Sequence, residues 1–173
     1  MLFRSKQNDL LINGGGHKMA AGFTVTRDRL QELRQHVNAH VANQLNGAPY
    51  VTELRIDGIL SVPALTLELV EKLALLAPYG AGHSEPRFAL SGVKIAMPKV
   101  VGENHVSCFL QDIGGGTSIK AIAFRALDTA LGETLLKAGS ARMNLAGHVT
   151  VNTWQGRTSV NFQIVDASPV WGS

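Results

Sequence analysis

Short strand-like stretches, separated by turn signals, dominate the chain from residue 50 onward. Alternation of polar and apolar residues predicts strands at 53–57, 88–96, 105–111, 118–124, 143–153 and 158–165. Three glycines at 114–116 and the pair Gln155-Gly156 provide turns between neighbouring strands. A parallel α/β sheet needs a crossover helix between successive strands, and this segment lacks that alternation. The pattern therefore predicts a small barrel rather than a parallel α/β sheet.

Two helices are expected to interrupt these strands. Residues 63–76 carry leucines at helical spacing, with Pro63 in the first turn and Pro78 after the last. A second, shorter helix is predicted at 126–138. Five or six short strands with two helical insertions fit a partly open barrel of the OB type. The predicted fold class is therefore α+β, with an OB-like β-barrel formed by residues 50–173.

The first 48 residues have a different organisation. Three glycines at 14–16 lead into a short strand, and the apolar spacing predicts a helix at 27–45. Thr26 is the expected N-cap of this helix, and Asn46-Gly47 is its expected end. One strand and one helix cannot enclose a core by themselves. This head is therefore predicted to be the remnant of a larger domain.

Charge is distributed unevenly between these two parts. The chain has 16 basic and 13 acidic side chains, which gives a formal charge of +3. Residues 1–49 hold six basic and three acidic side chains, whereas residues 50–173 hold ten of each. The surplus in the head permits contact with a polyanion, but an ordinary solvated face carries a similar surplus.

The composition is that of a globular protein. Hydrophobic residues make up 45% of the chain, and no stretch approaches the roughly 20 apolar residues of a membrane span. The first ten residues do not resemble a secretory signal. Cys108 is the single cysteine, so it cannot form an internal disulfide or a zinc site alone. We therefore expect a cytoplasmic protein with no membrane partner and with Cys108 buried in its core.

The glycines at 14–16 and the following His17 form the sharpest local motif. Consecutive glycines let the backbone approach a ligand and direct N–H groups at an anion, and a histidine can donate to the same phosphate. On this hypothesis Gly14, Gly15, Gly16 and His17 form a phosphate-binding loop, with Lys18 beside it. A tight turn with a histidine at its edge explains the same residues without a ligand. No Gly-Lys-Ser/Thr follows, so the segment is not a P-loop.

Aromatic and basic side chains mark candidate nucleic-acid contacts in the barrel. Trp154 and Arg157 flank a predicted hairpin turn, and Phe124 and Arg125 end a predicted strand that also carries Lys120. An exposed aromatic ring can stack on a base while a neighbouring cation contacts a phosphate. The same aromatic side chains could instead brace the barrel.

A pair of histidines in the head has the spacing of zinc ligands. His36 and His40 stand four residues apart on the predicted helix. Val37 occupies the position where a metalloprotease has its general-base glutamate, and no third ligand is evident. A solvated helix face is expected, and no metal site is predicted in this chain.

Three motifs resemble a known family. GGGHKMAAGF, at 14–23, is similar to the signature of the DHH-associated domain in RecJ-type exonucleases. LAPYGAGHSEPRF, at 76–88, resembles the PFG-x-GNPEP-x-F element that leads into the OB-like domain of that family. IKAIAF, at 119–124, is similar to a family strand ending in AIAF. In the second motif Tyr79 replaces the usual Phe and His83-Ser84 replaces Asn-Pro, so this loop is expected to differ in detail.

The resemblance implies a domain organisation. Residues 1–48 would be the C-terminal remnant of a DHH-associated domain, and residues 50–173 an OB-like nucleic-acid-binding domain. Family catalysis resembles two-metal phosphodiester hydrolysis, and its Asp-His-His motif does not occur here. The chain is therefore expected to be a fragment, truncated upstream, that has no catalytic residue of its own. Residues 1–5 are not expected to be native, because 2–5 match a peptide that a common sequencing adapter encodes.

The resemblance also implies a function for the whole protein. It would be a metal-dependent exonuclease that degrades single-stranded DNA from the 5′ end in recombination and repair, with Mn²⁺ or Mg²⁺ in the missing domain. In this chain His17 and the glycines would contact a phosphate near the scissile bond, and the barrel would guide the strand. Single-stranded DNA is the expected partner, and a single-strand-binding protein or another repair protein is a further candidate.

Two alternatives stay open on the sequence. One is a non-catalytic binding or protein-interaction module, which the zero net charge of residues 50–173 favours. The other is part of a DHH-family phosphodiesterase that acts on small nucleotides. The OB-like tail argues against the second alternative, because a short substrate needs no barrel to guide a strand.

Overall fold

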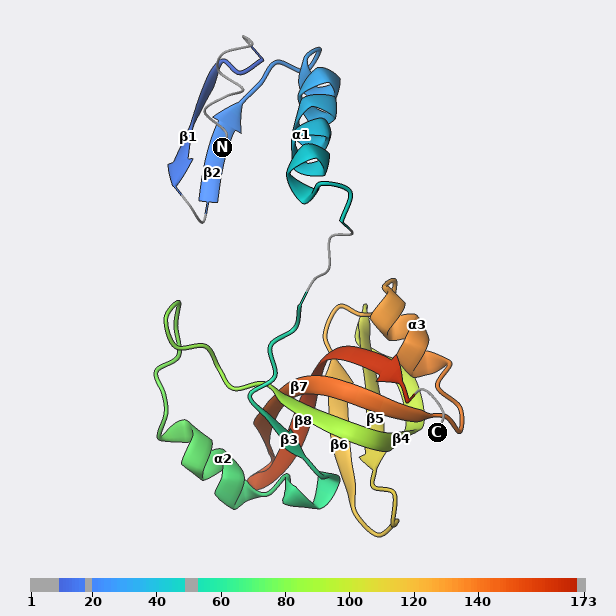
Figure 1. The fold of residues 1–173 in the computed structure, drawn as a ribbon. Coiled ribbons are helices and arrows are strands. Elements are labelled where there is room, and N and C mark those ends of the chain that lie inside the picture. The colour runs from blue at the N-terminus through green and yellow to red at the C-terminus, as the bar shows by residue number, and fades with distance from the viewer. Residues whose placement is uncertain (1–9, 18–19, 49–52, 171–173) are drawn as a thin grey trace. The chain divides into compact units, whose positions relative to one another are not determined.

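The computed structural model describes residues 10–17, 20–48 and 53–170. The chain forms two compact units, Met1–Glu53 and Leu54–Ser173 (Figure 1). The main hydrophobic cluster lies entirely within the second unit. In the described part of the chain, no helix is long and apolar enough to cross a membrane.

The first unit contains a two-stranded antiparallel sheet and one helix. β1 (Asn13–His17) pairs with β2 (Ala20–Thr24). α1 (Leu30–Leu45) follows these strands. As predicted, the helix ends at Asn46, which adopts the left-handed conformation with a φ of 48°.

Two features of this unit correct the sequence prediction. The glycines at 14–16 and His17 form a β-strand rather than a loop, because they pair with β2 along their whole length. A Cβ added to Gly16 would lie 2.5 Å from the Ala21 Cα, so close approach of the two strands explains this glycine. Thr26 does not cap α1, since the N-cap is Arg29 and no side chain caps the helix there.

Few side chains of the first unit are buried. Among its described residues, the buried hydrophobic side chains are Leu10, Leu11 and Leu33. Several larger apolar side chains of the strands and the helix are exposed, namely Ile12, Phe23, Leu30, Val37 and Val41. The described part of this unit therefore has only a thin core.

The second unit is a closed barrel of five strands. These strands are β4 (Phe88–Val101), β5 (His105–Gln111), β6 (Ser118–Ala123), β7 (Arg142–Trp154) and β8 (Arg157–Pro169). The barrel closes in the order β4-β5-β6-β8-β7 because β7 also pairs with β4. Within the barrel, β6 and β8 pair in parallel and the other neighbours are antiparallel. This arrangement confirms the predicted OB-like barrel, but the barrel is closed rather than partly open, because β7 pairs with β4.

The segment before the barrel differs from its prediction. Residues 53–57 do not form a strand, and β3 (Gly58–Leu60) instead adds a short parallel strand beside β4. Asp57 is tied to Arg87 by two bonds: its N–H donates to the Arg87 carbonyl at 2.8 Å, and its carboxylate accepts from the Arg87 N–H at 2.9 Å. The Arg87 N–H thus donates to the Asp57 side chain rather than to the backbone carbonyl of a neighbouring strand.

Both predicted helices of this unit are shorter than expected. The helix predicted at 63–76 divides into the 3-10 helix η2 (Val62–Ala64) and α2 (Leu67–Ala74), because the Thr66 hydroxyl caps α2 by accepting from the Leu69 N–H. The helix predicted at 126–138 is reduced to α3 (Ala130–Leu136). Its N-cap is Thr129, and this helix connects β6 to β7.

The inward-facing side chains of the barrel form one hydrophobic cluster. Phe162, Leu90 and Leu110 are fully buried on the strands, and Leu135 reaches the same cluster from α3. Burial of each such side chain stabilises the fold by roughly 1.5–3 kcal/mol. A Cβ at Gly132 would overlap the Ala126 carbonyl oxygen, so α3 lies close against the segment that follows β6.

Candidate nucleic-acid interface

The outer surface of β5, β6 and β8 forms a continuous strand face. Antiparallel pairing places Phe109 opposite Lys120, and parallel pairing places Lys120 beside Asn161. One further row joins Ile122 to Gln163. The side chains that alternate with these are the buried ones of the core, because successive residues of a strand point to opposite faces. We define the strand face by its outward side chains: His105, Phe109, Lys120, Ile122, Asn161 and Gln163.

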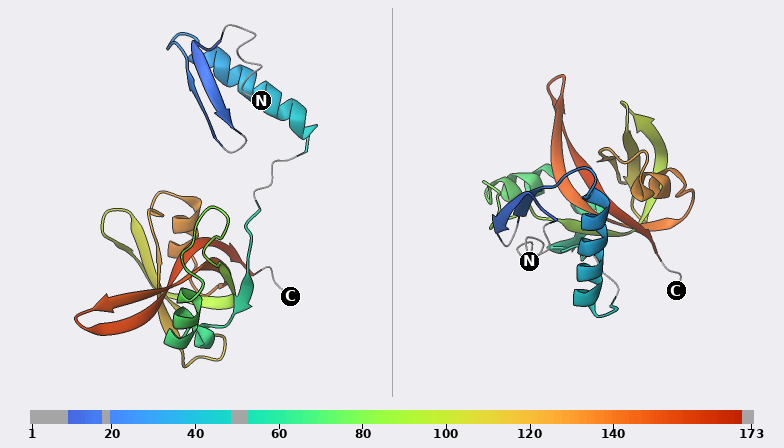
Figure 2. Two further views of the ribbon diagram at one scale, coloured as in Figure 1. Left: turned by 90° about the vertical axis from the view of Figure 1, so that its left-hand side faces the viewer. Right: turned by 90° about the horizontal axis from the view of Figure 1, so that it is seen from above.

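A hairpin extends this strand face beyond the barrel. β7 and β8 pair as far as Trp154 and Arg157, which lie directly opposite each other, and Figure 2 shows the ribbon projecting from the barrel. Gln155 and Gly156 form the turn with φ angles of 48° and 75°, as a two-residue hairpin requires. Trp154 is 70% exposed. The two-residue period puts Arg157 on the same side of β8 as Asn161, so the hairpin tip continues the face.

The residues that follow β6 lie at the opposite end of the face. Phe124 is 50% exposed, and its ring meets the His105 ring edge to face with 5.1 Å between centroids. The Arg125 N–H donates to His105 Nδ1 at 2.9 Å. His105 therefore holds an aromatic side chain at this end of the face, and Trp154 is exposed at the other end.

The barrel strands of the second unit carry more basic than acidic residues. Residues Leu54–Ser173 carry ten basic and nine acidic side chains, which gives a net charge of +1. The strands β4 to β8 carry five of the basic residues and one acidic residue, Asp166. The other eight acidic side chains lie in loops, in helices or before the barrel. The five strand cations are Lys94, Lys99, Lys120, Arg142 and Arg157.

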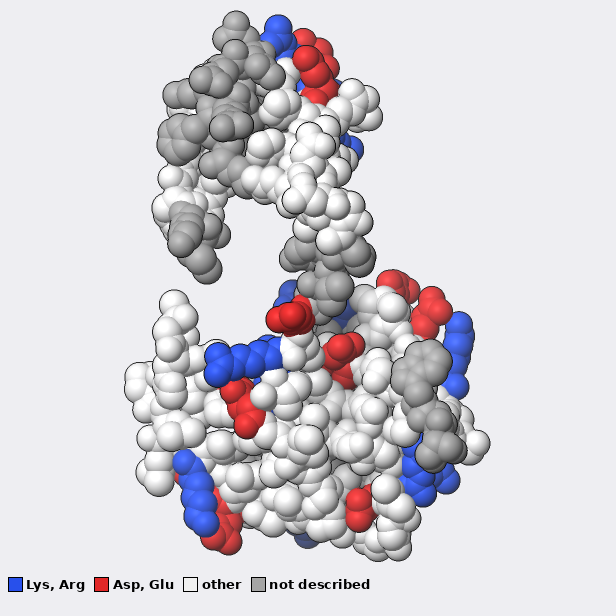
Figure 3. Space-filling model, viewed as in Figure 1, with Lys and Arg blue, Asp and Glu red and all other residues white. Residues whose placement is uncertain are grey.

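Among the residues that the structure describes, the strand cations form no ion pairs. The salt bridges between described residues join Arg55 to Asp57, Lys72 to Glu68, Lys137 to Glu133 and His148 to Glu85. None of these pairs includes a cation of β4 to β8. On the face of the barrel unit drawn in Figure 3, basic and acidic residues are interspersed rather than gathered in one patch. Of these cations, Lys120 lies on the strand face and Arg157 at the hairpin tip, near the exposed rings of Phe124 and Trp154.

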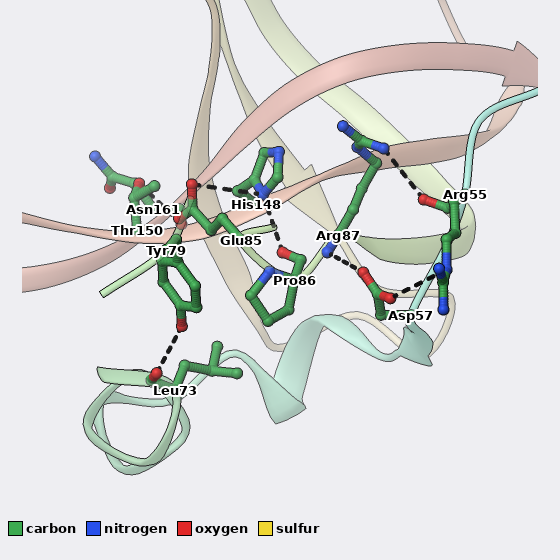
Figure 4. Close-up of polar contacts among 10 residues, drawn as sticks. All are labelled: Arg55, Asp57, Leu73, Tyr79, Glu85, Pro86, Arg87, His148, Thr150 and Asn161. Carbon is green, nitrogen blue, oxygen red and sulfur yellow. Dashed lines mark hydrogen bonds and ion pairs between the residues drawn. The ribbon is translucent and has the colours of Figure 1, made fainter. Parts of the chain in front are cut away.

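The segment 76–88 has a structural role beside the barrel. The Tyr79 hydroxyl donates to the Leu73 carbonyl at 2.6 Å, so it satisfies an acceptor at the end of α2 (Figure 4). His83 Nε2 bonds the Leu76 carbonyl at 2.7 Å. Tyr79 and His83 are two of the departures from the family motif, and both thus bond backbone carbonyls at the end of α2.

The same segment is fixed to β7 by a histidine. His148 Nδ1 donates to the Pro86 carbonyl at 2.9 Å and lies 3.8 Å from a Glu85 carboxylate oxygen (Figure 4). The Arg87 side chain donates to the Arg55 carbonyl at 3.2 Å. These contacts hold the chain that enters β4, and they place the motif against His148, which pairs with Gln163 of the strand face.

The sequence-predicted candidates fall into three groups. Phe124, Arg125 and Lys120 lie on β6 or directly after it, and Trp154 and Arg157 form the tip of the hairpin. Gly14, Gly15, Gly16 and His17 lie in β1 of the first unit, and Lys18 lies outside the described residues. Sequence reasoning missed His105, Phe109 and Asn161. The alternation that predicted β5 could have indicated Phe109, because Cys108 and Leu110 beside it are buried.

Cys108 and the His36–His40 pair lie outside the strand face. Across residues 10–17, 20–48 and 53–170, no three His, Cys, Asp or Glu side chains lie close enough to hold a metal ion. Burial raises the pKa of the Cys108 thiol to about 12, so the sulfur stays protonated and unreactive near neutral pH. His36 and His40 stack on one face of α1 with ring centroids 6.4 Å apart.

Comparison with known proteins places this fold in a family. The family described as the RecJ OB domain matches residues 56–166. The single-stranded-DNA-specific exonuclease RecJ of Dickeya dadantii is 32% identical over 163 residues, which are 93% of this chain and 27% of the relative. RecJ of Escherichia coli K12 is 29% identical over 161 residues, with 93% and 27% covered.

Solved structures agree with these relatives. The crystal structure of RecJ from Thermus thermophilus in complex with Mn²⁺ matches with a TM-score of 0.66 and 29% identity. The match covers 97% of this chain and 23% of that one. A structure of the same protein in complex with Mg²⁺ matches with a TM-score of 0.65. This chain thus spans about 27% of the length of the curated relatives named above.

Proposed function

The chain belongs to the RecJ OB domain family, and on this premise we propose that its barrel binds single-stranded DNA as part of a longer RecJ-type exonuclease. The observation that carries this proposal is the excess of basic over acidic residues on the barrel strands, five to one. Five strand cations lack ion-pair partners among the described residues, and Lys120 and Arg157 lie on or beside the strand face. Exposed cations of this kind can neutralise phosphates, while Phe124 and Trp154 offer ring faces for bases.

This arrangement suits binding without sequence preference. Stacking accepts any base, because every base has a π face, and cations contact a backbone that is the same along the strand. The zero net charge of residues 50–173 argued for a protein-interaction module. The composition of the strands weakens that argument, because Asp166 is the one acidic residue within β4 to β8 and it is not part of the strand face.

The remaining parts of the proposal concern the longer protein. Residues 1–48 would be the remnant of a DHH-associated domain, in which Gly14, Gly15, Gly16, His17 and Lys18 contact a phosphate near the scissile bond. The whole enzyme would degrade single-stranded DNA from 5′ to 3′ in cytoplasmic recombination and repair, with a single-strand-binding protein as a candidate partner. The described residues offer no metal-ligand set. Mn²⁺ or Mg²⁺ and the hydrolytic step are therefore assigned to another part of the protein.

A titration with labelled oligonucleotides tests DNA binding. The chain should bind single strands weakly and prefer them to duplex, over a site within the roughly 4–16 nucleotides usual for one OB fold. The slope of log affinity against log salt should be shallow, at about −0.7 for each phosphate contacted. Absence of binding at low salt, or equal binding of duplex, would contradict the proposal. Either result would favour the alternative that the chain is a protein-interaction module.

Two hairpin variants locate the stacking surface. Trp154→Ala should weaken binding by about 1–3 kcal/mol if a base stacks on the indole. Val151→Ala, on the other face of the same hairpin, is the matched control and should bind as wild type does. If both variants bind equally well, DNA does not stack on Trp154, and the contact must lie elsewhere on the barrel.

The purified chain should not cleave DNA with either metal. Its described residues contain no ligand set for Mn²⁺ or Mg²⁺, so incubation of single-stranded DNA with the chain should release no nucleotides. Metal-dependent release that persists through further purification would contradict the assignment of hydrolysis to another part of the protein.

A further inference from the structure

His105 contacts both of the residues that follow β6. It lies at the start of β5, 20 positions before Arg125, and its Nδ1 accepts a hydrogen bond from the Arg125 N–H at 2.9 Å. Its ring packs edge to face on Phe124, with centroids 5.1 Å apart and an interplanar angle of 78°. One side chain, itself half-buried, thus joins two separate strands of the face at the point where β6 ends.

The hydrogen bond determines the form of the imidazole. Because the backbone N–H of Arg125 is the donor, Nδ1 of His105 must present a lone pair, and the ring proton lies on Nε2. In the part of the chain that the structure describes, Nε2 has no hydrogen-bond partner. His105 therefore supplies one acceptor to the protein and keeps one donor unused.

This bond supports an unusual backbone conformation. Arg125 has a φ of 52°, which lies in the left-handed region. Residues other than glycine, asparagine and aspartate rarely adopt this conformation. A residue keeps this conformation only where contacts with the surrounding structure stabilise it. Residues of this kind are frequent at ligand-binding sites. The turn follows Phe124 directly, and Phe124 keeps half of its surface exposed.

We propose that His105 is a positioning residue for single-stranded DNA, which holds the Phe124 ring and the turn at Arg125 ready for the strand. This inference rests on the proposed function of the barrel and adds a residue that no motif marked. A ring already held against His105 loses little rotational freedom when a base stacks on its exposed surface. The same fixed turn presents Arg125 at a constant place beside that ring.

Four variants of the full 173-residue chain test the inference. His105→Leu removes the Nδ1 acceptor and puts an apolar side chain of similar volume in its place. His105→Asn is the matched control, because its amide oxygen lies near the place of Nδ1 and can accept from the Arg125 N–H. Phe124→Ala removes the stacking ring, alone and together with His105→Leu. Affinity for a labelled single-stranded oligonucleotide is measured by fluorescence anisotropy, and exchange of the Arg125 amide by NMR.

We expect His105→Leu to weaken binding about tenfold, which lies within the effect of losing one stacked base. His105→Asn should recover part of this loss. In the Phe124→Ala background, His105→Leu should change affinity by less than about twofold, because the residues act as one unit. The Arg125 amide should be protected in wild type and in His105→Asn, and should exchange quickly in His105→Leu.

Three results would overturn the inference: wild-type affinity in His105→Leu, an equal loss in the Phe124→Ala background, or no difference between Leu and Asn at position 105. If wild type itself does not bind single strands, the proposed function fails and the positioning role falls with it. If wild type binds and His105→Leu binds equally well, only the positioning role fails. Should His105→Leu not fold, comparison of His105→Asn with wild type and protection of the Arg125 amide decide the matter.

Discussion

The head and the barrel of this chain use their apolar residues in opposite ways. In the second unit, 18 buried residues form one cluster inside a closed barrel. In the described part of the first unit, three hydrophobic residues are buried, and the sheet has only two strands. Closure removes sheet edges and excludes water from the whole inner surface, which a two-stranded ribbon cannot do. The barrel can therefore carry exposed aromatics and cations that form no ion pair with another described residue, because its stability comes from its buried core.

Truncation of a core side chain should give the largest difference between the two units. Phe162 is fully buried at the centre of the barrel, so Phe162→Ala should lower the free energy of unfolding by about 3–5 kcal/mol. Val37 on α1 is 40% exposed, and Val37→Ala should have a much smaller effect. Urea unfolding of both variants checks this. Equal losses would mean that the head is as tightly packed as the barrel.

Hydrogen exchange should separate the two units in the unmodified chain. Amides of α1 should exchange through openings that cost far less free energy than the opening of β5 or β8. The reason is the small buried surface of the first unit rather than its helical hydrogen bonds. Mass spectrometry of exchanged peptides from 30–45 and 105–111 makes the comparison. Equal protection of both segments in a monomer would contradict it.

The reactivity of the Cys108 thiol measures opening of the barrel core, because Cys108 is buried there. Burial raises the pKa of its thiol to about 12 from an ordinary value of 9.0, so the native chain should react with a thiol reagent only after the barrel opens. A thiol with a raised pKa contributes stability that is fully present below pH 9 and is lost as pH rises from about 9 to 12. Denaturant unfolding at pH 8 and pH 11 should show this loss, and Cys108→Ala should lack that component. Rapid labelling of the native chain at pH 8 would show that the core is open to solvent.

The smallest expected effect concerns the strand cations. Lys94 on β4 lies directly opposite Arg142 on β7, and both are exposed. Like charges in this position repel, so Lys94→Gln should stabilise the barrel by about 0.2–1 kcal/mol at low salt, and less at high salt. Lys72→Gln is a control of opposite sign, since it breaks the exposed Lys72–Glu68 pair. If Lys94→Gln instead destabilised the barrel, Lys94 would contribute to the stability of the fold rather than oppose it.

The barrel was more predictable from the sequence than the elements around it. Alternation of polar and apolar residues located β4 to β8 within a few residues at most ends, and Gln155-Gly156 correctly indicated the hairpin turn. Local side-chain bonds explain the errors. Thr66 starts a new helix where periodicity predicted a continuous one, and Asp57 bonds to Arg87 where alternation predicted a strand.

The candidate site was only partly accessible to sequence reasoning. Trp154 and Arg157 were expected at a hairpin tip, and pairing between β7 and β8 places them opposite each other there. The sequence predicts that the glycines at 14–16 form a phosphate-binding loop, yet these residues lie in the strand β1. His105 could not be identified, because its contact with Arg125 depends on the register of β5 against β6. Periodicity predicts a strand, but register depends on pairing across the whole barrel.

Hydrogen exchange with and without a single-stranded oligonucleotide tests most directly whether the strand face of the barrel binds DNA. Bound DNA should slow exchange in peptides that cover 105–111, 118–125 and the hairpin around Trp154, and should leave peptides from α1 and α2 unchanged. A duplex of the same sequence serves as the control and should protect these peptides less. Protection confined to the first unit or to α2, or equal protection by duplex, would contradict the account.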